Sequence, residues 1–342
     1  MKWLSLVVGA AALALSVSNA AAAASDRLLV RLSVPTPVVR GDVDVTVAVS
    51  VTNPTREAIT LLRWELPSDR HEGAAFRILL DGKPVPYTGP LVKRAAPTKE
   101  DYVRIEPGAT LSYEVELTGA YDLSRNGMYS VEYIGKGAAD AGAIRSEAMY
   151  LWLESRSERA AAAPVVPTAD AASITFTGNC SASRKTTLTN AVAAATTYAA
   201  NAQTYLNRTP AATQRYTKWF GALTTARWNT AKTHYTNINS AFSTKPLTLD
   251  CSCTQSYYAY VYPTQPYKIY VCNAFWSAPL TGTDSKAGTL VHEMSHFNVV
   301  ASTDDWAYGQ SAAAALAISN PTRALDNADS HEYFAENTPS LP

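Results

Sequence analysis

Apolar and polar residues alternate in short runs through the first half of the chain. The longest run, from Val43 to Val51, reads Val-Asp-Val-Thr-Val-Ala-Val-Ser-Val. A period of two places successive side chains on opposite faces of a strand, and turn residues such as Asn53-Pro54 and Pro107-Gly108 separate the runs. Short strands with this spacing are typical of an antiparallel β-sandwich. The expected strands cover residues 28–34, 43–51, 76–80, 103–105, 111–117 and 129–134.

The second half has the periodicity of helices. Alanine is frequent from Thr186 to Leu206, and aromatic residues recur at helical spacing from Gln214 to Phe242, which indicates buried helix faces. Tyr-rich and Val-rich runs at 257–262 and 267–271 flank a Pro-Thr-Gln-Pro turn and predict a β-hairpin. Further helices are expected at Lys286–Phe297, Trp306–Ile318 and near Asp329–Asn337. The predicted fold class is therefore α+β.

Changes in composition mark the expected domain boundaries. Residues 1–20 combine a short cationic start with an apolar run too short for a bilayer span and with Ser18-Asn19-Ala20, which predicts a signal peptide cleaved near residues 20–24. Residues 159–173 begin with an Ala- and Pro-rich stretch without periodicity and predict a linker. The expected domains are a β-sandwich at 21–158 and a mostly helical domain with a small β-hairpin or sheet at 174–342.

The charge balance narrows the possible partners. The chain of 342 residues has 29 Lys and Arg against 29 Asp and Glu, so it lacks the basic surplus that binding to phosphates needs. No segment after the signal peptide is apolar enough to cross a membrane. We therefore expect an exported protein, extracellular or in transit through a periplasm, that binds neither nucleic acid nor membrane.

All four cysteines, Cys180, Cys251, Cys253 and Cys272, lie in the second half. An even number in an exported chain predicts two disulfides, for which three pairings exist. Cys251 and Cys253 would point to opposite sides of an extended backbone, which favours a different partner for each. A structural zinc site is the alternative, although Cys-x-Cys lacks the usual spacing of zinc ligands.

His292-Glu293-Met294-Ser295-His296 is an H-E-x-x-H motif. Positions i and i+4 of a helix share a face, so both imidazoles could bind one Zn²⁺, and Glu293 is placed to take a proton from a water at the metal. A catalytic zinc needs a third protein ligand and one open position. Ser302 stands where one zincin class has a third His, which excludes that class. The residues still open as third ligand are Asp304, Asp305, Asp329, His331, Glu332 and Glu336.

Three segments of the second half resemble the aspzincins, zinc peptidases of the deuterolysin type. They are Gly288–Phe297, Thr303–Gln310 and Asn327–Asn337, and the similarity extends back to Cys180. It points to the peptidyl-Lys metalloendopeptidase branch. The resemblance implies a zincin-like catalytic domain with one Zn²⁺ per chain. By the resemblance the metal ligands are His292, His296 and Asp305, and the catalytic residues are Glu293 and Tyr308, whose hydroxyl would donate to the developing oxyanion.

The resemblance also implies a specificity pocket and a disulfide pattern. Asp329 and Glu332 are three residues apart and share a helix face, and by the resemblance they form an S1′ pocket for Lys. The disulfides would join Cys180 to Cys251 and Cys253 to Cys272. One position departs from the family pattern, because Ser302 replaces a Gly. If that position needs a positive φ, Ser302 strains the loop that positions Asp305.

Together these features predict a secreted zinc endopeptidase, made as a proenzyme, that cuts proteins and peptides before Lys. The β-sandwich would be a prodomain that inhibits its own catalytic domain, for instance by placing Lys93, Arg94 or Lys99 near the acidic pocket. No Lys lies between Lys136 and Lys185, so we expect release either by cleavage near Arg156 or Arg159 or by a different protease.

Other functions fit the same motifs. A deuterolysin-like peptidase of broader specificity would lack the preference for Lys. A non-proteolytic zinc hydrolase or a toxin-like binding module would leave main-chain peptide bonds intact. The sandwich could also be a permanent accessory domain. In the peptidase hypothesis, the Tyr-rich hairpin near residues 267–271 would offer a strand edge to an extended substrate.

Overall fold

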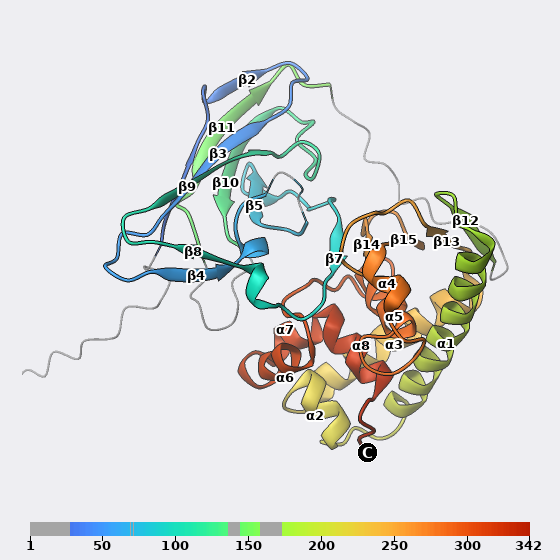
Figure 1. Ribbon diagram of the computed structural model, residues 1–342. Coiled ribbons are helices and arrows are strands. Elements are labelled where there is room, and N and C mark those ends of the chain that lie inside the picture. Colours follow the sequence, from blue (N-terminus) through green and yellow to red (C-terminus); the bar gives the residue numbers. More distant parts are fainter. Residues whose placement is uncertain (1–27, 69, 71, 136–143, 158–172) are drawn as a thin grey trace, which may run out of the picture.

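A computed structural model describes residues 28–68, 70, 72–135, 144–157 and 173–342 (Figure 1). Strands fill the N-terminal half and helices dominate the C-terminal half, so the α+β prediction is confirmed. The predicted signal peptide and all but the last residue of the predicted linker lie outside the described residues. Within the described part of the chain, no helix combines the length and the apolar character that a bilayer span requires.

We call the described residues from 28 to 157 the N-terminal β unit. Two mostly antiparallel sheets, with strand orders β1-β3-β9 and β2-β11-β10-β5-β6, share one hydrophobic core with the strand pair β4-β8. Val47, Val49 and Val51 of β3 enter this core, because alternate side chains of a strand face the same side. The strands are β1 (Leu29–Ser33), β2 (Val38–Arg40), β3 (Thr46–Thr52), β4 (Ile59–Leu62), β5 (Phe76–Leu80), β6 (Lys83–Pro84), β8 (Tyr102–Ile105), β9 (Thr110–Glu116), β10 (Gly127–Tyr133) and β11 (Met149–Glu154).

Every strand that alternation predicted in this unit is present. The strands β2, β4, β6 and β11 were not predicted, nor was β7 (Leu91–Lys93), which belongs to another sheet. In β11 the alternation is real, since Leu151 and Leu153 are buried. It is hidden in the sequence because Tyr150 and Trp152, on the outward face, are also apolar.

We call residues 173–342 the helical unit. Its core contains the aromatic residues that recur at helical spacing, among them Trp219, Trp228 and Tyr235, so their prediction as core is confirmed. Helix α5 packs against α1, α3 and α8. The helices are α1 (Ala182–Leu206), α2 (Gln214–Phe220), α3 (Thr225–Thr244), α4 (Asn273–Ser277), α5 (Lys286–His296), α6 (Gln310–Ser319), α7 (Pro321–Leu325) and α8 (Ala328–Glu336).

Two helices differ from the sequence pattern. The periodic stretch from Gln214 to Phe242 is interrupted at Gly221, whose φ is +75° and whose hypothetical Cβ would lie 2.1 Å from the carbonyl oxygen of Ala317. Only Gly fits this position, and the chain turns there. The helix expected from Trp306 begins only at Gln310. The preceding residues form a loop, because the N–H groups of Trp306 and Ala307 donate to the side chain of Asn327.

A further sheet, of five strands, joins the two halves of the chain. Its order is β12 (Ile174–Thr177), β13 (Leu247–Asp250), β15 (Lys268–Val271), β14 (Ala259–Val261) and β7 (Leu91–Lys93). The antiparallel pair β14-β15 is the predicted hairpin. The segment at 267–271, which was expected to offer a strand edge, contains β15, and β15 is paired on both sides. The outer strand of the hairpin is therefore β14. This strand pairs with β7 of the N-terminal β unit (Figure 1). In this pairing Lys93 lies opposite Ala259.

Two disulfides brace the helical unit. Cys180 pairs with Cys251, and Cys253 pairs with Cys272, which is the pattern that the resemblance implies. The first connects the segment before α1 to the end of β13, and the second ties the following loop to the start of α4. No cysteine is free, so the alternative of a cysteine zinc site is wrong.

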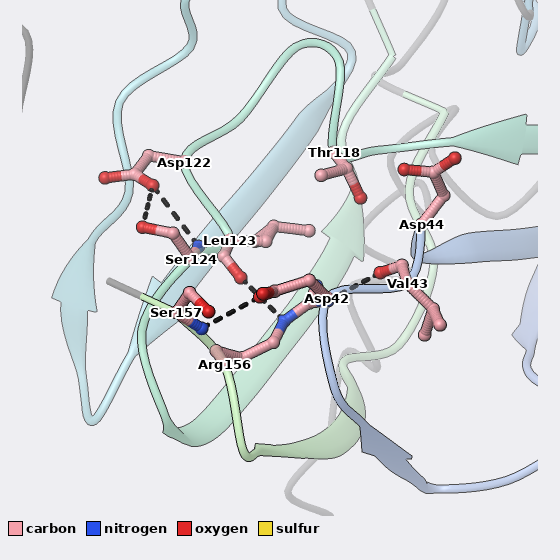
Figure 2. Close-up of a pocket in the computed structure, with 9 residues that line it drawn as sticks. All are labelled: Asp42, Val43, Asp44, Thr118, Asp122, Leu123, Ser124, Arg156 and Ser157. Atoms are coloured by element: carbon pink, nitrogen blue, oxygen red, sulfur yellow. Dashed lines mark hydrogen bonds between the residues drawn. The ribbon is translucent and has the colours of Figure 1, made fainter. Parts of the chain in front are cut away.

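Arg156 closes the end of the N-terminal β unit. Its guanidinium donates to the carbonyl oxygens of Leu123 and Val43 at 3.1 and 2.5 Å (Figure 2). It also donates to the carbonyl oxygen of Gly41 at 2.7 Å. The next residue is held as well, since the N–H of Ser157 donates to Asp42 at 2.8 Å. Arg156 is 8% exposed. It is therefore a poor site for a processing protease, and of the two expected arginines Arg159, outside the described residues, is the better candidate.

We expect R156M to loosen this end of the unit. Hydrogen bonds from a charged group contribute about 1.5–3 kcal/mol, so the amides of β2 and β11 should exchange about 10- to 100-fold faster in hydrogen–deuterium exchange. R104M is the control, because Arg104 and Glu106 form a pair whose side chains are 64% and 61% exposed. Equal exchange in the two variants would contradict the assignment of Arg156 as an anchor.

Candidate functional site

The H-E-x-x-H motif lies on α5, whose residues from Lys286 to His296 are all buried. Its N-terminus is capped within the protein: the hydroxyl of Ser285 accepts from the N–H of Gly288 at 2.9 Å. Glu336 of α8 in turn accepts from the N–H and the hydroxyl of Ser285 at 2.9 and 2.7 Å. The helix that carries the motif is thus held from its end as well as along its sides.

His292, His296 and Asp305 bring three ligand atoms together. The two Nε2 atoms are 3.1 Å apart, and Oδ1 of Asp305 lies 3.2 and 3.4 Å from them. Ligand atoms bound to zinc at about 2.0–2.1 Å in a tetrahedron lie about 3.3 Å from one another. This Oδ1 is buried and makes no hydrogen bond within the described residues. The three side chains therefore fit a tetrahedral zinc ion with one position left for water or substrate.

The loop after α5 orients this group. Nδ1 of His296 lies 2.8 Å from the carbonyl oxygen of Thr303, to which it donates, so that Nε2 keeps its lone pair for a metal. The backbone of Asp304 is bound to the segment before α8, with Asp304 N–H to Asp326 at 2.7 Å and Ala328 N–H to Asp304 at 3.0 Å. Asp305 is therefore positioned by α5 on one side and by the start of α8 on the other.

Ser302 has a left-handed backbone conformation, which was expected to strain the loop that positions Asp305. Its φ is +53°. A non-Gly residue there costs about 1–2 kcal/mol relative to its preferred region. The backbone hydrogen bonds of Asp304 hold the loop despite this cost.

Glu293 lies next to the first imidazole and is fully buried. Neither of its carboxylate oxygens has a hydrogen-bond partner among the described residues. Burial raises the pKa of Glu293 well above its usual value. A carboxylate with a raised pKa and open acceptor sites is suited to accept a proton and to return it.

The remaining candidates for a third ligand have other contacts. Asp304 accepts from the N–H of Asp305 at 2.8 Å, and Glu336 caps α5. His331 lies against His234, with ring nitrogens 2.9 Å apart. Asp329 and Glu332 do approach His292, but at Nδ1 rather than at Nε2, at 2.9 and 3.5 Å. They form a second acidic group on the other side of the ring.

The side chain of a lysine from the N-terminal β unit lies within this second acidic group. Nζ of Lys93 lies 2.8 Å from Oδ1 of Asp329, 2.8 Å from Oε2 of Glu332 and 3.5 Å from Asp284. The side chains of Lys93, Asp329 and Glu332 are completely buried. We call Asp284, Asp329 and Glu332, with the rings of Tyr258 and Tyr333 at 5.7 and 5.3 Å from Nζ, the lysine pocket.

Charge attraction decides the protonation of this cluster. Burial lowers the pKa of Lys93, but Asp329 and Glu332 outweigh that effect and hold it well above its usual value. Burial also opposes ionisation of the acids. Lys93 overcomes this for Asp329, whose pKa is lowered, whereas burial prevails for Glu332, whose pKa is raised. The pocket therefore binds its lysine as an ammonium ion, whose charge favours the ionised form of Asp329.

The main chain next to Lys93 runs across the metal group. The hydroxyl of Tyr308 donates to the carbonyl oxygen of Val92 at 3.0 Å, and the N–H of Val92 donates to Oδ2 of Asp305 at 3.2 Å. On the far side, the N–H of Tyr258 donates to the carbonyl oxygen of Lys93 at 3.0 Å. The Val92–Lys93 peptide thus lies between the candidate metal ligands and the lysine pocket.

Of the three basic residues considered from the sequence, only Lys93 enters the pocket. Arg94 pairs with Glu72 and packs over the rings of Trp64 and Tyr257, at 5.0 and 5.6 Å from their centres. Lys99 is exposed in the short 3-10 helix η3 (Lys99–Asp101). Arg94 therefore clamps the strand next to the pocket.

The sequence reasoning missed three pocket residues, Asp284, Tyr258 and Tyr333. Tyr333 directly follows Glu332 on α8, and its hydroxyl donates to Asp284 at 2.6 Å. Asp284 directly precedes Ser285, the cap of the helix with the H-E-x-x-H motif. Its position beside that cap is the one feature of the sequence that could have indicated Asp284 as a pocket residue. Tyr258 belongs to the predicted Tyr-rich hairpin, where no pattern distinguishes it from its neighbours.

Comparisons with known proteins agree with this geometry. The family model described as lysine-specific metallo-endopeptidase, Aspzincin_M35, matches residues 205–336. An extracellular protease of Aeromonas hydrophila is 47% identical over 87% of this chain and 89% of its own length. A peptidyl-Lys metalloendopeptidase of Pleurotus ostreatus is 53% identical over 49% of this chain and 99% of its own.

A solved zinc peptidase of Grifola frondosa is 50% identical and covers 48% of this chain and 100% of its own, with a TM-score of 0.46. The Aeromonas relative matches across so much of both chains that common ancestry extends beyond the motif segments. An H-E-x-x-H helix, a following aspartate and a match of this extent lead to one assignment. The chain belongs to the aspzincin family of zinc metalloendopeptidases.

Proposed function

We propose that this chain is a secreted proenzyme whose helical unit hydrolyses the peptide bond before Lys. The observation that carries the proposal is the lysine pocket, in which the chain's own Lys93 is bound by Asp329 and Glu332 beside the candidate zinc ligands. Peptidyl-Lys metalloendopeptidases of Pleurotus ostreatus and Armillaria mellea, 53% and 51% identical, support this specificity.

In this proposal one Zn²⁺ is bound by His292, His296 and Asp305, where it would polarise the scissile carbonyl and lower the pKa of water. Glu293 accepts a proton from the attacking water and returns it to the leaving amine. Tyr308 donates to the carbonyl oxygen of the residue before Lys, in the way it contacts Val92, as negative charge develops there. The β14 edge binds the extended substrate through its main chain.

We further propose that residues 21–158 are a prodomain, residues 159–173 a linker and residues 174–342 the enzyme. The prodomain inhibits because β7 pairs with β14 and Lys93 fills the pocket that a substrate lysine needs. The Pleurotus relative supports a separable enzyme, since half of this chain spans 99% of its length. The relative named an extracellular protease and the two disulfides support export from the cytoplasm.

The zinc assignment predicts that D305N loses most of its zinc affinity, because the ligand loses its charge. The loss should exceed the roughly 10- to 100-fold drop that follows removal of an outer-shell partner. Competition with a chromophoric chelator measures it. D304N is the control, since Asn keeps the oxygen that accepts from the N–H of Asp305. Equal affinities of the two variants would remove Asp305 from the ligand set.

The specificity predicts that the processed enzyme cuts a denatured protein almost exclusively before Lys, with every cut abolished by a zinc chelator. Mass spectrometry of the peptides identifies the sites. E293Q should lower the rate by about 10²- to 10⁴-fold, as expected for loss of a general base, while zinc content is kept. Cuts spread over many residue types would instead favour an enzyme of broader specificity, and intact main chains would favour a non-proteolytic hydrolase or binding module.

Inhibition by Lys93 predicts that K93M makes the precursor more active on a short Lys peptide. Charged contacts of this kind contribute about 1.5–3 kcal/mol, so the initial rate should rise about 10- to 100-fold even though β7 is retained. K99M is the matched control, because Lys99 is exposed and outside the pocket. A K93M precursor as inactive as the K99M precursor would show that Lys93 does not block the site.

A further inference from the structure

Asp329 has more contacts than a lysine pocket requires. Its Oδ1 accepts from Nζ of Lys93 at 2.8 Å and lies 2.9 Å from Nδ1 of His292, the ring nitrogen opposite the metal group. Its Oδ2 accepts from the backbone N–H of Gly309 at 2.6 Å. One fully buried carboxylate therefore contacts the bound ammonium, an imidazole of the metal group and the residue that follows Tyr308.

Glu332 offers a close comparison within the same pocket. It is equally buried, it carries the same type of charge, and its Oε2 is also 2.8 Å from Nζ of Lys93. Its distance to Nδ1 of His292 is longer, at 3.5 Å, and within the described residues neither of its oxygens accepts a hydrogen bond. The two acids thus lie at the same distance from the lysine nitrogen and differ in their contacts with the rest of the site.

The contact with His292 acts on the metal group. A carboxylate next to the outer nitrogen of a zinc-binding imidazole favours a proton on that nitrogen, leaves the inner nitrogen free for the metal and makes it more basic. Asp329 is the nearer of the two carboxylates to this nitrogen. Bulk solvent does not reach this contact, because the side chains of Asp329 and His292 are both completely buried.

The contact with Gly309 acts on Tyr308, whose hydroxyl donates to the carbonyl oxygen of Val92. Gly309 has a φ of +87° and stands between Tyr308 and the first residue of α6. The hydrogen bond from its N–H to Asp329 fixes the backbone just after Tyr308, whose hydroxyl lies 3.0 Å from the carbonyl oxygen of Val92. Without this bond the backbone directly after Tyr308 loses an anchor to α8.

We infer that Asp329 is a positioning residue for zinc binding and for Tyr308 as well as a contact for lysine, whereas Glu332 serves the lysine alone. The lysine contact rests on the proposed function. The link to His292 and Gly309 does not, because it concerns the metal site itself.

The test compares D329N with E332Q in the full-length precursor. Zinc affinity, measured by chelator competition, should fall about 10- to 100-fold in D329N and stay close to that of the unchanged protein in E332Q. Both variants leave the ammonium of Lys93 with one carboxylate fewer. D329N and E332Q are therefore also made in the K93M background. There the buried ammonium is absent, so a folding defect caused by an unpaired Lys93 cannot explain a difference between the two variants.

A second measurement addresses Tyr308. Processed enzymes are given a peptide in which norleucine replaces Lys, so that no ammonium enters the pocket. At saturating zinc, kcat on this peptide should be lower in D329N than in E332Q, because only Asp329 holds Gly309. Equal zinc affinities and equal norleucine rates in the two variants would reduce Asp329 to a lysine contact and overturn the inference, whatever the preference for Lys proves to be.

Discussion

The site is organised by the burial of negative charge. Glu293, Asp305, Asp329 and Glu332 lie close together with at most 2% of their surface exposed. Ionisation of a buried carboxyl group costs several kcal/mol unless a positive partner compensates for it. Two positions for cations meet this requirement, one at the Nε2 atoms of His292 and His296 and one in the lysine pocket. The proposed zinc site and the proposed selection of a substrate ammonium group thus have one electrostatic origin.

The same constraint explains why the N-terminal β unit contributes a lysine rather than an apolar plug. An apolar side chain in the pocket would leave Asp329 and Glu332 buried without a positive partner. Lys93 supplies the charge, and Arg94 holds the neighbouring backbone through Glu72 and Trp64. In the proposed precursor, inhibition and charge compensation are therefore assigned to the same side chain.

Local patterns predicted the parts of this protein that local physics determines. Alternation gave the strands of the N-terminal β unit, helical spacing gave the aromatic core, and His292 and His296 meet because positions i and i+4 share a face. The choice of Asp305 required the family resemblance, since the loop before it is shaped by hydrogen bonds to residues 326–328. The pairing of β7 with β14 joins segments about 170 positions apart. It could not be predicted from the sequence, because a strand of three residues is too short to show a periodic pattern.

The shared sheet has a consequence for the enzyme that we propose is released from the N-terminal β unit. While β7 is in place, the backbone of β14 is paired on both sides. Its departure leaves a bare sheet margin, a template to which another polypeptide, including a second molecule of the enzyme, can add. This margin is only the length of β14, Ala259–Val261, which is too short to hold a partner by backbone pairing alone. The brevity of one strand thus favours transient capture of extended chains over permanent self-association.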